Sequence, residues 1–87
     1  MSYQLIYSNQ AKQDAKKLKN TPLAKKAKQL LGVISENPFQ DPPPFESLVG
    51  DLRGAYSRRI NIQHRLVYQV IEETKTIKVL RLWSHYE

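Results

Sequence analysis

The sequence predicts a single α+β domain in which an N-terminal strand and a two-helix hairpin pack on a twisted antiparallel sheet. Three observations lead to this fold class. A short segment of β-forming residues opens the chain, two segments with helical periodicity follow it, and strand-like runs fill the second half. With 87 residues, of which 40% are hydrophobic, the chain can build one small core, so residues 1–87 are expected to form one domain.

The first strand and the first helix are expected in direct succession. Residues 3–7 (YQLIY) are rich in β-forming side chains and predict a strand. Ser8 or Asn9 can then cap a helix, because their side-chain oxygens accept a hydrogen bond from an otherwise unpaired helix N–H. This helix has a narrow apolar stripe, formed by Ala11, Ala15 and Leu18.

The second helix has boundary signals at both ends. Thr21 can serve as its cap, and Pro22 fits the first helical position, where a missing N–H costs nothing. Asn37 ends the helix, because the residue before a proline is biased away from the helical conformation. The helix has a wider apolar stripe, formed by Leu23, Ala27, Leu30, Leu31 and Ile34.

A proline-rich crossover leads from the helices to the sheet. Residues 38–45 (PFQDPPPF) are expected to be extended and stiff, which would hold Glu46 in place with little loss of chain entropy. Three strand-like runs follow, at 55–62, 64–71 and 76–84. The polar connection 72–75 fits a hairpin, so these strands predict an antiparallel meander.

Charge and composition restrict the class of protein. Fourteen lysines and arginines against eight acidic residues give a net charge of +6, which is typical of a protein that binds nucleic acid, although an acidic protein partner would fit as well. The chain has no cysteine and two histidines, so neither disulfides nor a metal or other cofactor are expected. It has no apolar run near the length of a membrane span and no signal peptide, so we expect a cytoplasmic protein without membrane contact.

Strand alternation brings a set of polar side chains to one face of the predicted sheet. Successive strand residues point to opposite faces, and this parity separates an aliphatic set under the helices from an exposed set. The exposed set contains Ser57, Arg59, Arg65, Arg81 and His85. This face is not purely polar, because its parity also includes Val67, Ile71, Ile77 and Val79. A single β-bulge would change the assignment of a strand.

These residue types suit the cleavage of a phosphodiester. Guanidinium groups match phosphate oxygens with a planar fork, histidine titrates near neutral pH, and the carboxylate of Glu46 can act as a base. RNA supplies its own nucleophile in the 2′-OH, so cleavage needs groups that move protons and cations that stabilise charge. Taken singly, each residue also has an ordinary interpretation: Glu46 as a loop carboxylate or helix cap, Arg65 as a sheet ion-pair residue, Arg58 as a solvated side chain, and His85 as a surface residue.

Five segments of the chain form a recognisable set: 37–39 (NPF), 46–48 (ESL), 54–60 (GAYSRRI), 64–68 (HRLVY) and 85–86 (HY). Together they resemble YoeB-type toxins of the RelE superfamily, the toxin halves of bacterial toxin–antitoxin pairs. The similarity follows nearly the whole chain in length and element order, and it is specific from residue 46 to residue 68. The two lysine-rich helices resemble the family only weakly.

The resemblance implies the RelE/YoeB-like microbial ribonuclease fold and a ribosome-dependent endoribonuclease that cuts mRNA in the ribosomal A site without a metal ion. In that family, the residue matching Glu46 is taken as general base and the one matching His85 as general acid. Arg65 would stabilise the phosphorane. Substrate contacts are expected from Arg59, Tyr86, Ser57, Arg58 and Arg81. The implied partners are a cognate YefM-like antitoxin, mRNA and ribosomal RNA, and a second copy of the chain in a homodimer.

The chain departs from the family pattern at Val49 and Gly50, where basic or polar residues are expected, and at Glu87, which extends past the usual terminal tyrosine. Two other functions fit much of the same sequence. A ParE-like toxin would keep the fold and inhibit DNA gyrase by protein contact, and a non-catalytic RNA-binding module would hold phosphate without cutting. An acid–base pair such as Glu46 and His85 favours the enzyme over the gyrase inhibitor, which needs no such pair.

Overall fold

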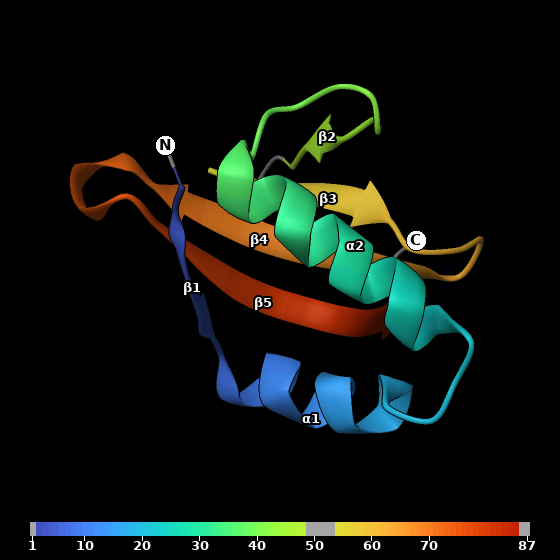
Figure 1. The fold of residues 1–87 in the computed structure, drawn as a ribbon. Helices are drawn as coiled ribbons and strands as arrows, with labels where there is room; N and C mark the ends of the chain where they lie inside the picture. Colours follow the sequence, from blue (N-terminus) through green and yellow to red (C-terminus); the bar gives the residue numbers. More distant parts are fainter. Residues whose placement is uncertain (1, 49–53, 86–87) are drawn as a thin grey trace.

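The computed structural model describes residues 2–48 and 54–85, the last three of them by their backbone alone. These residues form one five-stranded sheet and two α-helices, and the strand order is β1-β5-β4-β3-β2 (Figure 1). The elements in chain order are β1 (Gln4–Tyr7), α1 (Asn9–Leu18), α2 (Leu23–Glu36), β2 (Glu46–Ser47), β3 (Ala55–Arg59), β4 (His64–Ile71) and β5 (Thr76–His85). A 3-10 helix, Glu72–Thr74, forms the turn between β4 and β5.

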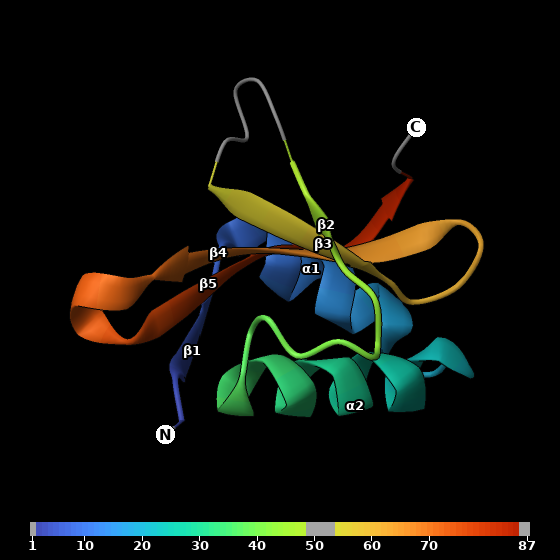
Figure 2. The ribbon, with the colours of Figure 1, turned by 90° about the horizontal axis from the view of Figure 1, so that it is seen from above.

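The sheet is antiparallel from β2 through β5, as the predicted meander requires, and β1 joins it parallel to β5. The sheet is therefore mixed rather than purely antiparallel. Helix α2 crosses one face of the sheet, and α1 lies along the β5 edge (Figure 1). Seen from above, β2 and the end of β5 extend from the sheet on the side away from α2 (Figure 2). None of the helices in the described ranges is long and apolar enough to cross a membrane.

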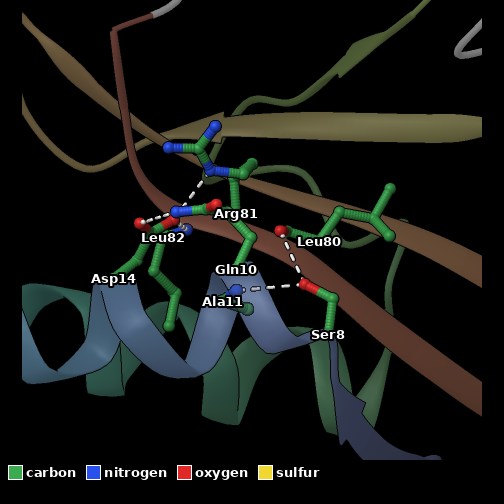
Figure 3. Close-up of polar contacts among 7 residues, drawn as sticks. All are labelled: Ser8, Gln10, Ala11, Asp14, Leu80, Arg81 and Leu82. Atoms are coloured by element: carbon green, nitrogen blue, oxygen red, sulfur yellow. Dashed lines mark hydrogen bonds and ion pairs between the residues drawn. The ribbon is translucent and has the colours of Figure 1, made fainter.

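Helix α1 covers the part of β5 that β1 leaves unpaired. The pairing between β1 and β5 ends at Val79, and the next residues of β5 bond to α1 instead (Figure 3). The hydroxyl of Ser8 donates to the carbonyl oxygen of Leu80 at 2.9 Å and accepts from the N–H of Ala11 at 3.0 Å, so it also caps the helix. The buried carboxylate of Asp14 accepts from the N–H of Leu82 at 3.0 Å. These bonds satisfy a strand edge that would otherwise expose unpaired backbone groups.

The main core lies between the sheet and the two helices. It is formed by Ala11, Leu18, Ala27, Leu30, Ile34, Ile60, Leu66, Tyr68, Ile77, Val79 and Leu82. The stripe predicted for α2 is confirmed at its three most buried positions. The stripe predicted for α1 is partly wrong, because Ala15 is exposed and Asp14 takes the buried position between Ala11 and Leu18.

Two irregularities in β5 change the faces that simple alternation predicts. The register of β4 on β5 shifts between Arg65 and Val67 and again between Val67 and Tyr68. Ile77 and Val79, expected on the open face, consequently lie in the main core, while Leu80 packs on the opposite side. A bulge inserts one extra residue and so reverses the alternation of everything beyond it.

The segment between α2 and β3 is less regular than predicted. Helix α2 ends at Glu36 with Asn37 extended, as expected, but the crossover bends at Pro42 and Pro43 instead of running straight. Strand β3 ends at Arg59, three residues earlier than predicted. Beyond it, the side chain of Asn61 accepts hydrogen bonds from the N–H groups of Gln63 and His64 and turns the chain into β4.

Candidate active site

Strand β2 brings Glu46 onto the open face of the sheet, opposite the main core. The strand is two residues long and pairs with β3, so that Glu46 lies opposite Ser57. Ser57 in turn lies opposite Val67 of β4. Paired residues of neighbouring strands point to the same face, which places Glu46, Ser57 and the alternate residues of β4 on one surface.

Arg65 connects these strands through its side chain. Its Nη1 lies 3.5 Å from Oε2 of Glu46 and donates to Oγ of Ser57, also at 3.5 Å. The Arg65 side chain is 20% exposed and that of Glu46 is 68% exposed. Both distances lie beyond the usual range for a hydrogen bond, so the guanidinium holds the carboxylate loosely. An ion pair this exposed contributes at most about 1 kcal/mol to stability, and both partners remain accessible to a ligand.

Arg59 and His85 occupy backbone positions next to Arg65. Arg59 is exposed and lies directly opposite Arg65 in the β3–β4 pairing. On the other side of β4, Ser84 lies opposite Arg65 and His85 lies opposite His64. The His85 backbone therefore lies one residue beyond the position on β5 that faces Arg65. The His85 side chain lies outside the described part. His64 itself is buried.

A small apolar cluster supports this polar surface. Leu48, Ala55 and Val67 are buried together, and Leu80 packs against them. Its members come from the segment after β2 and from β3, β4 and β5, so the cluster ties the same strands that carry Glu46, Ser57 and Arg65. Of the aliphatic residues expected on this face, Val67 is thus buried in this cluster, and Ile77 and Val79 are buried in the main core.

The prediction that Arg58 binds substrate is not supported by its position and needs correction. Its side chain points to the opposite face from Ser57 and is 1% exposed. Its guanidinium donates to the carbonyl oxygens of Pro38 and Pro43 and to the hydroxyl of Tyr68. A side chain enclosed in this way cannot reach a ligand on the open face without breaking those bonds.

Arg81 also differs from its prediction, because its side chain binds within the chain rather than joining the Glu46 group. Its Nε donates to Oδ2 of Asp14 at 2.8 Å, and the side chain is 40% exposed (Figure 3). Asp14 is not among the residues predicted from the sequence. The signal was its spacing, since residues 11, 14 and 18 share one face of a helix. The predictions for Tyr86, Val49 and Gly50 fall outside the described residues.

Glu46 does not line either of two hollows in the described part of the chain. A groove of about 710 Å³ separates α1 from α2, and its apolar floor is bordered by Lys16, Lys19, Lys25 and Lys28. A smaller hollow of about 400 Å³ lies between α2, the crossover and the β3–β4 loop, and Arg59 contributes to its wall. No cluster of three His, Asp or Glu side chains with the spacing of a metal site occurs in the described ranges.

Comparison with known proteins gives consistent matches. A family model described as a YoeB-like toxin of bacterial type II toxin–antitoxin systems matches residues 7–86. Toxin YoeB of Mycobacterium bovis is 38% identical over 63 residues, or 72% of each chain. A chain of the heterotetrameric YoeB–YefM toxin–antitoxin complex from Staphylococcus aureus has a TM-score of 0.81 and 35% identity, covering 99% of this chain and 100% of that one. The YoeB dimer from Staphylococcus aureus has a TM-score of 0.81 and 34% identity, with the same coverage.

The family model and the two structural matches extend over nearly the full length, including the helix pair and the sheet. They define the chain as a toxin of a bacterial type II toxin–antitoxin system. Within that class, the chain belongs to the family of YoeB-like toxins. The predicted fold class and the resemblance read from the sequence are confirmed.

Proposed function

We propose that this toxin is a ribosome-dependent endoribonuclease that cuts mRNA through its own 2′-OH and so inhibits translation. The observation that carries the proposal is the approach of Glu46, Ser57 and Arg65 on the open face, with Arg59 beside them. This places a potential base next to a guanidinium that can hold a phosphate. Membership of the YoeB-like family supports the same activity.

In the proposed reaction, Glu46 takes the proton of the 2′-OH, and the 2′ oxygen attacks the adjacent phosphorus. Arg65 and Arg59 stabilise the charge of the phosphorane. The bond to the 5′ oxygen then breaks, and His85 protonates that oxygen as it leaves. The products are a 2′,3′-cyclic phosphate and a 5′-OH. Each positioned proton transfer is worth about 10²–10⁴-fold in rate, and a fixed cation at the developing charge is worth about 10²–10³-fold.

The loose contact between Glu46 and Arg65 fits an enzyme that completes its site on the ribosome. The mRNA of a programmed ribosome would place a phosphate beside Arg65. The guanidinium would then make shorter contacts to the phosphate in place of its 3.5 Å contact with Glu46. Much of the catalytic effect would then come from holding the 2′-OH, phosphorus and 5′ oxygen in line. Dependence on ribosomes is part of this proposal, and so is activity in the cytoplasm, where the ribosomes are.

A set of three alanine variants tests the proposal. We expect Glu46→Ala, Arg65→Ala and His85→Ala each to lower the cleavage rate by about 10²-fold or more, because each removes a proton-transfer or charge-stabilising group. The measurement is single-turnover cleavage of mRNA on programmed ribosomes, with 5′ ends mapped by primer extension. Wild-type rates in all three variants would refute the mechanism. Inhibition of DNA supercoiling without mRNA cleavage would instead identify a gyrase inhibitor.

We also propose three macromolecular partners. The lysines of α1 and α2 form a basic surface that suits ribosomal RNA, because phosphate contacts supply most of such affinity. A YefM-like antitoxin would neutralise the toxin, as the toxin–antitoxin complex from Staphylococcus aureus suggests. A homodimer is proposed on the example of the YoeB dimer from that organism.

A further inference from the structure

Arg58 joins the crossover to the sheet at two points. Its Nη2 donates to the carbonyl oxygen of Pro38 at 2.9 Å, and its Nη1 donates to that of Pro43. Its Nε donates to the hydroxyl of Tyr68 at 3.1 Å. The two carbonyls belong to opposite ends of the segment that leads into β2, so one guanidinium fixes the shape of the whole crossover.

This arrangement depends on the shape of arginine as well as its charge. A guanidinium buried at 1% exposure is tolerated only when its N–H groups are satisfied, and here three of its nitrogens donate to oxygen atoms. Lysine carries its charge on a single nitrogen and cannot span the same separated acceptors. The hydroxyl of Tyr68 reinforces the arrangement by donating to the carbonyl oxygen of Pro38 at 2.7 Å.

The crossover leads directly into Glu46, the first residue of β2. Phe45, the residue before Glu46, lies with its ring centroid 4.9 Å from the Arg58 guanidinium carbon. The same ring packs edge-on against Tyr56, with centroids 5.9 Å apart. Strand β2 is only two residues long, and the Glu46 side chain is 68% exposed. Few contacts of its own therefore hold Glu46, and its position depends on the segment that precedes it.

We propose that Arg58 is a positioning residue for the general base: from the buried face of β3 it fixes the crossover and Phe45, and thereby sets the position of the Glu46 carboxylate on the opposite face. The proposal rests on the catalytic role assigned to Glu46 above. Arg58 itself touches neither the substrate nor the reacting atoms. Its neighbour Ser57 faces Arg65 on the open side of the sheet. Adjacent residues of β3 therefore contact the crossover on one face and the candidate site on the other.

A double-mutant cycle tests this role. We expect Arg58→Lys to lower the single-turnover cleavage rate on saturating ribosomes by about 10- to 100-fold, because a displacement of about 1 Å at a reacting group has that effect. Ribosome affinity should stay within about twofold of wild type. In a Glu46→Gln background, where residual cleavage is followed over hours, Arg58→Lys should change the rate by less than about twofold, because the group it positions is gone.

Equal losses from Arg58→Lys in both backgrounds would overturn the positioning role, since Arg58 would then act independently of Glu46. A wild-type rate in the single variant Glu46→Gln would be a different failure. It would show that Glu46 is not the general base, and so would refute the proposed function itself. A general loss of stability is controlled with Ile77→Val, a buried change on β5 far from the crossover in the sheet order. That variant should keep the wild-type rate below its melting temperature.

A second variant keeps the proposal testable if Arg58→Lys does not fold. Phe45→Leu leaves Arg58 and its carbonyl partners unchanged but removes the ring between them and Glu46. We expect it to lower the cleavage rate about 3- to 10-fold in the wild-type background and to have no further effect with Glu46→Gln. An equal effect in both backgrounds would contradict the proposed path from Arg58 to Glu46.

Discussion

At the scale of single residues, three buried polar side chains of this toxin make shorter hydrogen bonds than the more exposed pair Glu46 and Arg65. Arg58, Tyr68 and Asp14 are each fully or almost fully enclosed, and each makes several hydrogen bonds that one substitution would leave unpaired. Glu46 and Arg65 are more exposed and make longer contacts. Enclosed, hydrogen-bonded groups thus lie behind a surface whose own polar groups are more exposed and make longer contacts.

Tyr68 gives a prediction for alkaline pH. Burial raises the pKa of its hydroxyl above the ordinary value of 10.0, although the nearby Arg58 opposes this. Because the unfolded state ionises first, the stabilisation is complete below pH 10.0 and is lost as the pH rises toward the folded pKa. We therefore expect the free energy of unfolding to fall more steeply above pH 10 in wild type than in Tyr68→Phe, measured by denaturant titration. Parallel curves for the two proteins would contradict this assignment.

At the scale of elements, α1 acts as the partner of a strand edge. Its cap Ser8 and its buried Asp14 bond to the stretch of β5 that immediately precedes residues 83–85 (Figure 3). A helix that satisfies backbone groups of a strand fixes the strand more firmly than apolar packing alone, because a buried backbone group without a partner is costly. The end of β5, and with it the backbone of His85, depends on this helix.

Asp14→Ala tests the role of this edge. The change removes the acceptor of the Leu82 N–H and the partner of Arg81, so we expect the free energy of unfolding to fall by about 2–4 kcal/mol. Gln13→Ala, an exposed change one residue earlier on the same helix, is the matched control and should stay within about 0.5 kcal/mol of wild type. Equal stabilities of the two variants in urea titrations would show that the Asp14 contacts contribute nothing.

At the scale of the whole molecule, the proposed function assigns different roles to the basic helices and to the open face of the sheet. The lysines border the groove between α1 and α2, whereas strand β2, which carries Glu46, extends from the sheet on the side away from α2 (Figure 2). A molecule built this way can bind a large polyanion through one surface and present another to the scissile linkage.

Charge reversal on the helices tests this division. We expect Lys12→Glu, Lys16→Glu and Lys25→Glu combined to weaken ribosome binding by at least about 10-fold and to reduce its dependence on salt, because each lysine lost removes a phosphate contact. Binding is measured by cosedimentation at several salt concentrations. The matched control reverses Lys75, which pairs with Glu72 in the turn after β4. Unchanged affinity and salt dependence in the triple variant would refute a role of these lysines in ribosome binding.

Local signals in the sequence were sufficient for much of the fold. The cap at Ser8, the end of α2 at Asn37 and the full extent of β4 depend on side chains within a few residues, and each prediction matches the structure. Strand β2 escaped prediction because two residues carry no periodicity. The faces of β5 escaped because a bulge is set by pairing between strands.

By itself, the sequence determined the class of fold, the order of the main helices and strands, and the family, and it supplied the residue types on which the proposed cleavage of RNA depends. These follow from local pattern and from side-chain chemistry. Only the tertiary structure decided which face each residue takes. It brought Glu46 of β2 to Arg65 of β4 across strand β3. It also turned Arg58 inward against the crossover and paired Arg81 with Asp14. The physical reason is that strand register and the pairing of buried charges depend on contacts between segments distant in the chain, which no local pattern encodes.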